Sequence, residues 1–178
     1  PEYYLSWAHE VGIPLTEARQ TYYQRISQSF NYLEKEAAKG RIQYYGISSN
    51  TFPGHTDEHN FTCLETIWHI ANNISTKHHF RAVQMPMNLI EYQAVTTINQ
   101  PSMQSALEFA CIKGLAVLIN RPFNAFINHR LFRLVDITGS LSGNMSEMEN
   151  LLNELIRQEN YFDHSLIDTF EFDEATKK

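Results

Sequence analysis

Apolar residues recur at steps of three and four in three stretches of the chain, which is the spacing of one buried face of an α-helix. The first stretch covers 16–39, where Thr16 provides the N-cap and Gly40 ends the helix. The second covers 61–71, and the third begins at Pro101. We therefore predict three helices, whose inward-facing residues are Tyr22, Ile26, Phe30, Leu33 and Ala37, then Phe61, Leu64, Ile67, Trp68 and Ala71, then Met103, Leu107, Ala110 and Cys111.

Short β-prone runs alternate with these helices. They start near residues 42, 81 and 115, and each ends in polar residues. The third run, 115–119, is almost unbroken in its apolar character, which predicts a strand buried on both faces. Strands that alternate with helices predict a βαβαβ unit with parallel strands. Residues 1–15 are aromatic and irregular, and we predict a loop there.

The alternation weakens after residue 124, and we divide the chain there into 1–124 and 125–178. The second part contains a turn of small residues at 139–144 and an amphipathic helix at about 146–160. It ends in an acidic tail at 163–178, which we expect to be mobile.

Composition and charge exclude several classes of protein. The 178-residue chain is 43% hydrophobic, which is enough for one domain with a core, and its net charge is −6 with no run of Lys or Arg. This balance argues against a nucleic-acid partner. No apolar run approaches the ~18 residues of a membrane-spanning helix, so we expect no membrane partner. Cys63 and Cys111 cannot build a disulfide framework and favour a cytoplasmic location, although an organelle stays open because the chain begins at Pro1.

Polar residues follow each predicted strand. In parallel α/β sheets, ligands bind beyond the carboxyl ends of the strands, so these exits form the candidate site. Their hydroxyl, amide and guanidinium groups suit an amide or phosphate ligand rather than a metal. The alternative is that they satisfy local backbone groups, as strand exits commonly do. The exits are Ser48, Ser49 and Asn50, then Gln84 and Asn88, then Asn120 and Arg121.

Familiar catalytic and phosphate motifs are absent. Neither G-x-G-x-x-G nor G-x-x-x-x-G-K-[ST] occurs, and there is no G-x-S-x-G nucleophile elbow. The four-residue spacing of His55 and His59 would place both on one helical face as metal ligands, but no third ligand follows. We interpret them as a solvated helix start and predict no metal site.

Residues 33–50 contain Gly40-Arg41-Ile42 followed by Gly46-Ile47-Ser48. This run resembles the signature x-x-G-K/R-I-x-x-x-G-V/I-S-x of the aldo/keto reductases, which leads into the fifth strand of their barrel. Residues 83–89 resemble the sixth strand, and 110–118 with Pro122-Phe123 resemble the seventh. Order and spacing agree across about residues 16–124.

This resemblance implies part of a (β/α)8 TIM barrel, with NADP(H) as cofactor and hydride transfer between the nicotinamide and a small-molecule carbonyl or alcohol. By position, Ser48, with Ser49 or Asn50, and Gln84 would hold the nicotinamide carboxamide. Asn120 stands where many members have a Tyr that stacks on the nicotinamide ring, and Arg121 would contact a phosphate.

The family's catalytic Asp, Tyr, Lys and His belong to the first half-barrel, so the resemblance implies no catalytic residue in this chain. We expect a fragment of a larger reductase, which needs the missing half-barrel or a partner chain. Two alternatives stay open. One is a non-catalytic relative that binds the cofactor or serves as a regulatory barrel. The other is a self-contained α/β domain that binds a protein partner through its open sheet edge.

Overall fold

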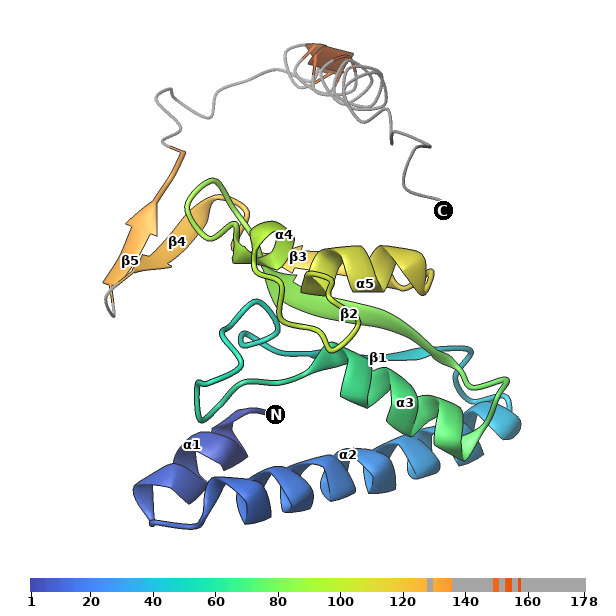
Figure 1. Cartoon of the computed structure of the whole chain (residues 1–178). Helices are drawn as coiled ribbons and strands as arrows, with labels where there is room; N and C mark the ends of the chain where they lie inside the picture. The colour runs from blue at the N-terminus through green and yellow to red at the C-terminus, as the bar shows by residue number, and fades with distance from the viewer. Residues whose placement is uncertain (128–129, 136–148, 151–152, 155–156, 158–178) are drawn as a thin grey trace, which may run out of the picture. The chain divides into compact units, whose positions relative to one another are not determined.

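The structure is a computed structural model that describes residues 1–127, 130–135, 149–150, 153–154 and 157. The chain divides into two compact units, Pro1–Val135 and Asp136–Lys178. The first unit contains ten helices and strands among its described residues (Figure 1). In chain order they are α1 (Tyr3–Glu10), α2 (Leu15–Ala38), β1 (Tyr45–Ser48), α3 (Leu64–Ile74), β2 (Phe80–Pro86), α4 (Gln93–Thr96), α5 (Ala106–Ile112), β3 (Ala116–Asn120), β4 (Asn124–Ile127) and β5 (Arg130–Arg133).

The central sheet has the order β1-β2-β3, and all of its strands are parallel. Helix α3 connects β1 to β2, whereas α4 and α5 lie between β2 and β3 in sequence. The predicted βαβαβ unit with parallel strands is therefore confirmed. Three strands flanked by helices make a mixed α/β fold, and the described strands do not close into a barrel.

The core lies on one face of this sheet. Val83 is 1% exposed there, and Ile47 and Val117 pack against the same cluster. Helix α2 contacts α3, and α3 contacts α5, so the helices form a continuous layer over that face. The helical residues of this cluster include Tyr22, Ile26 and Phe30 of α2, Leu64, Ile67 and Ala71 of α3, and Ala106, Phe109 and Ala110 of α5.

The prediction that 115–119 is buried on both faces is wrong. Val117 and Ile119 pack against the core, but Leu118 between them is 51% exposed. Side chains alternate along a strand, so Leu118 points to the face that the helices leave open. An apolar run shows that a strand tolerates burial, whereas the elements packed on each face decide whether burial occurs.

The predicted loop at 1–15 is also wrong in part, because α1 occupies Tyr3–Glu10. Leu5 and Ala8 are three residues apart and fully buried, and α1 contacts α2. Burial of this short apolar face against a long helix stabilises a segment whose own sequence has little helical periodicity.

The third predicted helix starts later than expected. Helix α5 begins at Ala106 and not at Pro101, because Ser105 accepts a hydrogen bond from the Glu108 N–H and completes a capping box. Met103 precedes this cap with a positive φ of 61° and is 77% exposed. Met103 and Cys111 therefore do not belong to the inner face predicted for them.

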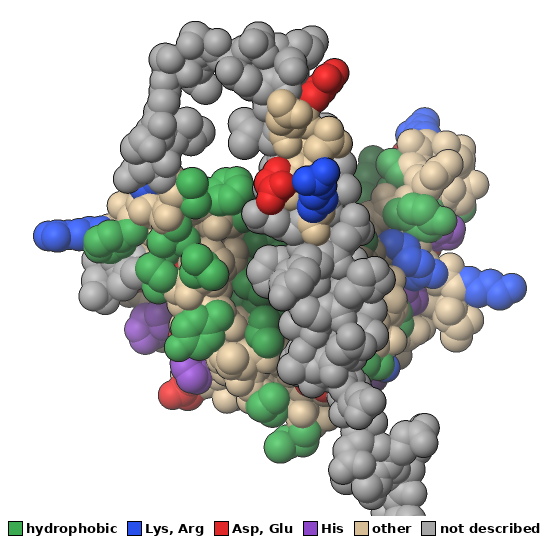
Figure 2. All heavy atoms as spheres, turned by 90° about the horizontal axis from the view of Figure 1, so that it is seen from above, with side chains coloured by type: hydrophobic (Ala, Val, Ile, Leu, Met, Phe, Trp, Pro, Cys, Tyr) green, Lys and Arg blue, Asp and Glu red, His purple; other side chains and the backbone are tan. Residues whose placement is uncertain are grey.

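A β-hairpin follows the sheet where no element was predicted. β4 and β5 pair antiparallel, with Phe126 opposite Leu131. Phe126 and Leu131 are 50% and 66% exposed. Hydrophobic side chains are accordingly visible at the surface on the side of the molecule where the hairpin and α4 lie (Figure 2).

The predicted helix at about 146–160 falls largely outside the described residues, and the turn at 139–144 and the acidic tail at 163–178 fall wholly outside them. Within the described ranges, no helix combines the length and the apolar character needed to cross a lipid bilayer.

Candidate functional site

The three strands of the central sheet place paired residues side by side on its open face. The pairing register sets Ser48 of β1 opposite Gln84 of β2, and Gln84 opposite Leu118 of β3. Ser48 is exposed and Gln84 is half-buried. The hydroxyl and the amide expected to bind a ligand therefore come from neighbouring positions and face the same side as the exposed Leu118.

A shallow cavity of 220 Å³ lies on this open face. Ser48, Gln84 and Leu118 line it, together with the small residues Gly46 and Ala82. A Cβ at Gly46 would come within 2.5 Å of the Ala82 carbonyl oxygen, so only glycine permits this approach of β1 to β2. Small residues along the two strands keep the floor of the cavity open.

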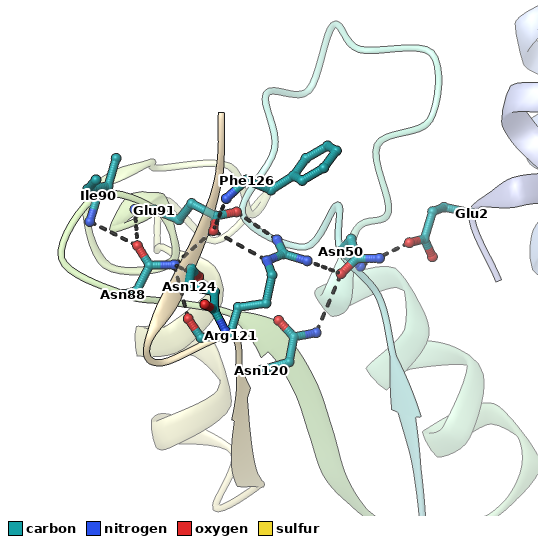
Figure 3. Close-up of polar contacts among 9 residues, drawn as sticks. All are labelled: Glu2, Asn50, Asn88, Ile90, Glu91, Asn120, Arg121, Asn124 and Phe126. Carbon is teal, nitrogen blue, oxygen red and sulfur yellow. Dashed lines mark hydrogen bonds and ion pairs between the residues drawn. The ribbon is translucent and has the colours of Figure 1, made fainter. Parts of the chain in front are cut away.

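Arg121 lies at the carboxyl edge of the same sheet, directly after β3, and is engaged by two other segments (Figure 3). Its Nη2 donates to Glu91 Oε1 at 2.6 Å and its Nε donates to Glu91 Oε2 at 3.3 Å. Its Nη1 donates to Asn50 Oδ1 at 3.2 Å. The guanidinium thus bridges the exit of β1 and the loop after β2. The backbone φ of Arg121 is +57°, a conformation that residues other than glycine rarely adopt.

Glu91 is the anchor of this polar network. Besides Arg121, it accepts hydrogen bonds from the Phe126 N–H at 3.0 Å and the Asn88 side-chain amide at 2.8 Å. Burial raises the pKa of the Glu91 carboxyl, but the bonds from Arg121, Phe126 and Asn88 outweigh burial and hold that pKa below its ordinary value. Glu91 is therefore ionised at neutral pH and neutralises Arg121.

Asn88 holds the loop that carries Glu91. Its Oδ1 accepts from the backbone N–H groups of Ile90 and Glu91, and its amide also donates to the carbonyls of Arg121 and Asn124. All four heavy-atom distances are between 2.8 and 3.2 Å. For Asn88 the alternative interpretation of the strand exits is therefore the correct one, since its side chain satisfies local backbone groups.

Ser49 points away from the open face. It is 1% exposed, and its hydroxyl donates to Glu2 Oε2 at 3.2 Å. The other oxygen of Glu2 accepts from the Asn50 N–H at 3.0 Å. Burial opposes ionisation of Glu2, but backbone hydrogen bonds, including the one from Asn50, lower the pKa of its carboxyl. Ser49 thus positions the β1 exit, and the structure does not bring it to the exposed cavity.

Asn120 leaves one hydrogen-bonding atom unused at the edge of the site. Its Nδ2 donates weakly to Asn50 Oδ1, at 3.4 Å, whereas its Oδ1 is buried and has no hydrogen-bond partner among the described residues. A buried acceptor without a donor is costly, and a ligand N–H or a water molecule would relieve that cost. Asn120 is therefore the one predicted strand-exit side chain whose buried polar atom is unsatisfied.

The predicted residues therefore fall into three groups. Ser48 and Gln84 lie on the open face, Asn50, Asn120 and Arg121 are joined by hydrogen bonds at the carboxyl edge, and Ser49 turns inward. Glu2 and Glu91 are polar neighbours of these residues that were not predicted. The Asn88-x-x-Glu91 spacing indicates a side-chain-stabilised turn, but no local signal pairs Glu91 with Arg121, thirty positions away.

The two histidines considered as metal ligands do not form a metal site together. His59 stacks on His9 of α1 instead, with ring centroids 4.2 Å apart. Across the part of the chain that the structure describes, no three His, Cys, Asp or Glu side chains lie close enough together to hold a metal ion.

No family model, curated protein or solved structure matches this chain. The geometry of the site therefore carries the functional interpretation. Ser48, Gln84 and Asn120 offer both donors and acceptors, which a neutral amide ligand needs. Arg121 is the cation of the site, but Glu91 already neutralises it. The arrangement thus fits an uncharged amide better than it fits a phosphate.

Proposed function

We propose that this chain forms the nicotinamide-binding wall of an NADP(H)-dependent oxidoreductase similar to the aldo/keto reductases. In this proposal the three parallel strands are part of a (β/α)8 barrel, and the open sheet face lines its interior. The observation that carries the proposal is the register of Ser48 opposite Gln84 on that face. Their hydroxyl and amide groups lie over a cavity kept open by Gly46 and Ala82.

The roles of the residues follow from their positions. Ser48 and Gln84 would bind the carboxamide and fix which face of the ring is presented, while Asn120 Oδ1 would accept the remaining amide N–H. When bound, the nicotinamide ring supplies or accepts a hydride at the carbon of a small carbonyl or alcohol substrate. The proton donor for the substrate oxygen would come from the missing half-barrel or from a partner chain.

A cofactor phosphate would meet competition at Arg121. The guanidinium has three of its donors in bonds to Glu91 and Asn50. A phosphate would therefore have to displace Glu91 or use the remaining N–H groups. For this reason we expect the nicotinamide end of the cofactor to contribute more to binding by this chain than the phosphate end.

NMR titration of the full 178-residue chain tests this proposal. Nicotinamide mononucleotide and NADP⁺ are added to labelled protein, and the Gln84 side-chain amide and the Ser48 and Leu118 backbone amides are followed. We expect saturable shifts at these groups, and in Gln84→Ala the shifts of the Ser48 and Leu118 backbone amides should disappear. The control is Gln43→Ala, the same change at an exposed position before β1. Absence of saturable shifts up to about 10 mM ligand would contradict the proposal.

A non-catalytic relative that binds the cofactor predicts the same NMR shifts. Only a measurement of cofactor oxidation or reduction with a carbonyl or alcohol substrate separates it from the oxidoreductase. Asn120, which stands where many aldo/keto reductases have a Tyr that stacks on the nicotinamide ring, favours the non-catalytic relative. The partner-binding alternative differs, because it predicts that a protein, and not a cofactor, binds this chain, through the open edge of the sheet.

A further inference from the structure

Arg121 sets the orientation of the Asn50 side chain at the carboxyl edge of the sheet. Arg121 Nη1 donates to Asn50 Oδ1 at 3.2 Å, and Asn120 Nδ2 donates to the same oxygen at 3.4 Å. A guanidinium has only donors, so it can face the oxygen of an amide and not its nitrogen. Asn50 Nδ2 is therefore turned away from Arg121. Asn50 is exposed, and no acceptor among the described residues binds its Nδ2, so this donor is available to a ligand carbonyl.

Glu91 holds Arg121 in this position from the opposite side (Figure 3). The carboxylate accepts from Arg121 Nη2 at 2.6 Å and from Nε at 3.3 Å, and this two-point contact fixes the plane of the guanidinium. Glu91 is itself held by the Phe126 N–H and the Asn88 side-chain amide. The direction of the Asn50 amide is therefore determined by Glu91, through Arg121.

Glu91 also determines the charge at this edge. The side chains of Arg121 and Glu91 are 28% and 17% exposed, and together they carry no net charge. Without Glu91, the Arg121 cation would lie one hydrogen bond from Asn50 and would attract an anionic ligand there. The pair removes that attraction and leaves a polar but neutral surface beside the Asn50 amide.

We propose that Glu91 is a specificity-determining residue of the candidate site, which selects a neutral carboxamide over the corresponding carboxylate by neutralising Arg121 and turning the Asn50 amide toward the ligand. This inference rests on the proposed function, in which the carboxamide belongs to a nicotinamide nucleotide. It adds to that function a reason why the amide form of the ligand, and not the acid form, is bound.

The hydrogen bonds that the site offers match a carboxamide. Asn50 Nδ2 donates to its carbonyl oxygen, together with Ser48 or Gln84 from the open face. Asn120 Oδ1, a buried acceptor without a donor among the described residues, needs an N–H group that a carboxamide has and a carboxylate lacks. A carboxylate would place a second acceptor near that atom and would gain nothing from the neutralised Arg121.

An alternative is that Arg121 itself binds an anionic group of the ligand and that Glu91 only stabilises the loop after β2. Three of the Arg121 donor contacts are already made to Glu91 and Asn50, which disfavours this role. The two interpretations also predict different effects of substitutions at Glu91 and Arg121, so one experiment separates them.

Binding of two matched nucleotides to the full chain, measured by NMR titration at neutral pH, tests the inference. Nicotinamide mononucleotide and nicotinic acid mononucleotide differ only in the carboxamide or carboxylate on the ring. We expect the parent protein to bind the amide more tightly. Glu91→Gln should shift the ratio of the two affinities about fivefold toward the acid, because Arg121 becomes an uncompensated cation. Arg121→Gln should shift the ratio toward the amide, because the Glu91 charge then repels the acid.

Glu58→Gln is the matched control. Glu58 lines a pocket of 190 Å³ together with Glu91 and Asn50, and its carboxylate accepts from the His55 N–H and not from Arg121. The substitution removes the same charge and should leave the ratio of affinities unchanged. Without any ligand, the Asn50 side-chain amide resonances should move in Arg121→Gln and stay in place in Glu58→Gln. Arg121→Gln also keeps the inference testable if Glu91→Gln fails to fold.

The outcomes separate this inference from the proposed function. If the parent protein binds the amide nucleotide but prefers it no more than the acid, or if the ratio is unchanged in Glu91→Gln and Arg121→Gln, this inference is wrong and the proposed function stands. An equal loss of affinity for both nucleotides in Arg121→Gln would assign Arg121 to their shared phosphate and overturn the inference as well. A parent protein that binds neither nucleotide contradicts both.

Discussion

Arg121 and Glu91 are thirty positions apart in sequence, and they form a two-point ion pair across the carboxyl edge of the sheet. Their side chains are 28% and 17% exposed, so solvent screens the pair only in part. The pair fixes a residue with a positive φ at the end of β3 and holds the loop after β2 against it. It also leaves the candidate site without a free positive charge.

Replacing Glu91 with Gln should make unfolding less sensitive to acid. The folded-state pKa of Glu91 is lowered, so its carboxylate stabilises the fold above the unfolded pKa, and this contribution is lost as pH falls through the folded pKa. At pH 7 we expect a loss of about 1–2 kcal/mol in the free energy of unfolding, because Arg121 loses its partner. Urea denaturation between pH 7 and pH 3 measures both effects.

The same experiment has an internal control. Glu2 also has a lowered pKa, so the Glu91→Gln variant should still lose part of its stability in acid. The difference between parent and Glu91→Gln must therefore narrow as pH falls. A constant difference from pH 7 to pH 3 would show that the Glu91 charge does not stabilise the fold.

Gly46→Ala should destabilise the sheet. The added Cβ would lie 2.5 Å from the Ala82 carbonyl oxygen and 2.9 Å from the Ala82 Cβ. Strand β1 would have to move away from β2, at a cost of about 1–3 kcal/mol in the free energy of unfolding. The double variant Gly46→Ala/Ala82→Gly removes the contact with the Ala82 Cβ but keeps the contact with the carbonyl oxygen of residue 82. It should therefore recover only part of the lost free energy of unfolding. Chemical denaturation that shows no loss for the single variant would contradict the close approach.

Substitutions at neighbouring positions of β3 should differ in effect. Leu118→Ser changes a half-exposed side chain on the open face, and we expect a change within about 0.5 kcal/mol in the free energy of unfolding. Val117→Ser places a hydroxyl against the core and should cost about 2 kcal/mol. Urea midpoints of the two variants measure the difference. Equal losses would mean that both faces of β3 are covered.

Tyr22 and Tyr23 should ionise later than the exposed tyrosines. Burial raises the pKa of both phenols above the ordinary 10.0, to about 12 for Tyr23. Their neutral forms therefore stabilise the fold up to about pH 10, and this contribution is lost as pH rises, because the unfolded chain ionises first. Absorbance titration at high pH should show one fewer late-ionising group in Tyr23→Phe. A variant that instead loses a group titrating near pH 10 would refute the burial effect.

The helical periodicity and the β-prone runs were sufficient to predict the parallel βαβαβ unit. These patterns are local, because a helix or strand buries whichever of its residues share one face. Ile67 is buried, as its spacing predicts. Strands β4 and β5 were missed because they lie outside the alternation of helices and strands, whereas β1, which is equally short, stands between two helical stripes.

Part of the candidate site was predictable for a similar reason. Polar residues after parallel strands meet at one edge, so Ser48 and Gln84 were expected to lie close together, and their pairing register confirms this. Sequence could not distinguish Ser49, which turns inward to Glu2. One residue of difference along a strand reverses the direction of a side chain, and the partner that stabilises the inward position is forty-seven residues away.

The amino-acid sequence by itself determined the order and type of most elements and the polar residues that follow the three strands of the central sheet, because these depend on spacing within a few residues. The tertiary structure decided which face of β3 is covered, that α1 forms on α2, and that Glu91 neutralises Arg121. Burial and charge pairing depend on neighbours that are distant in sequence, and those neighbours are set only when the whole chain has packed.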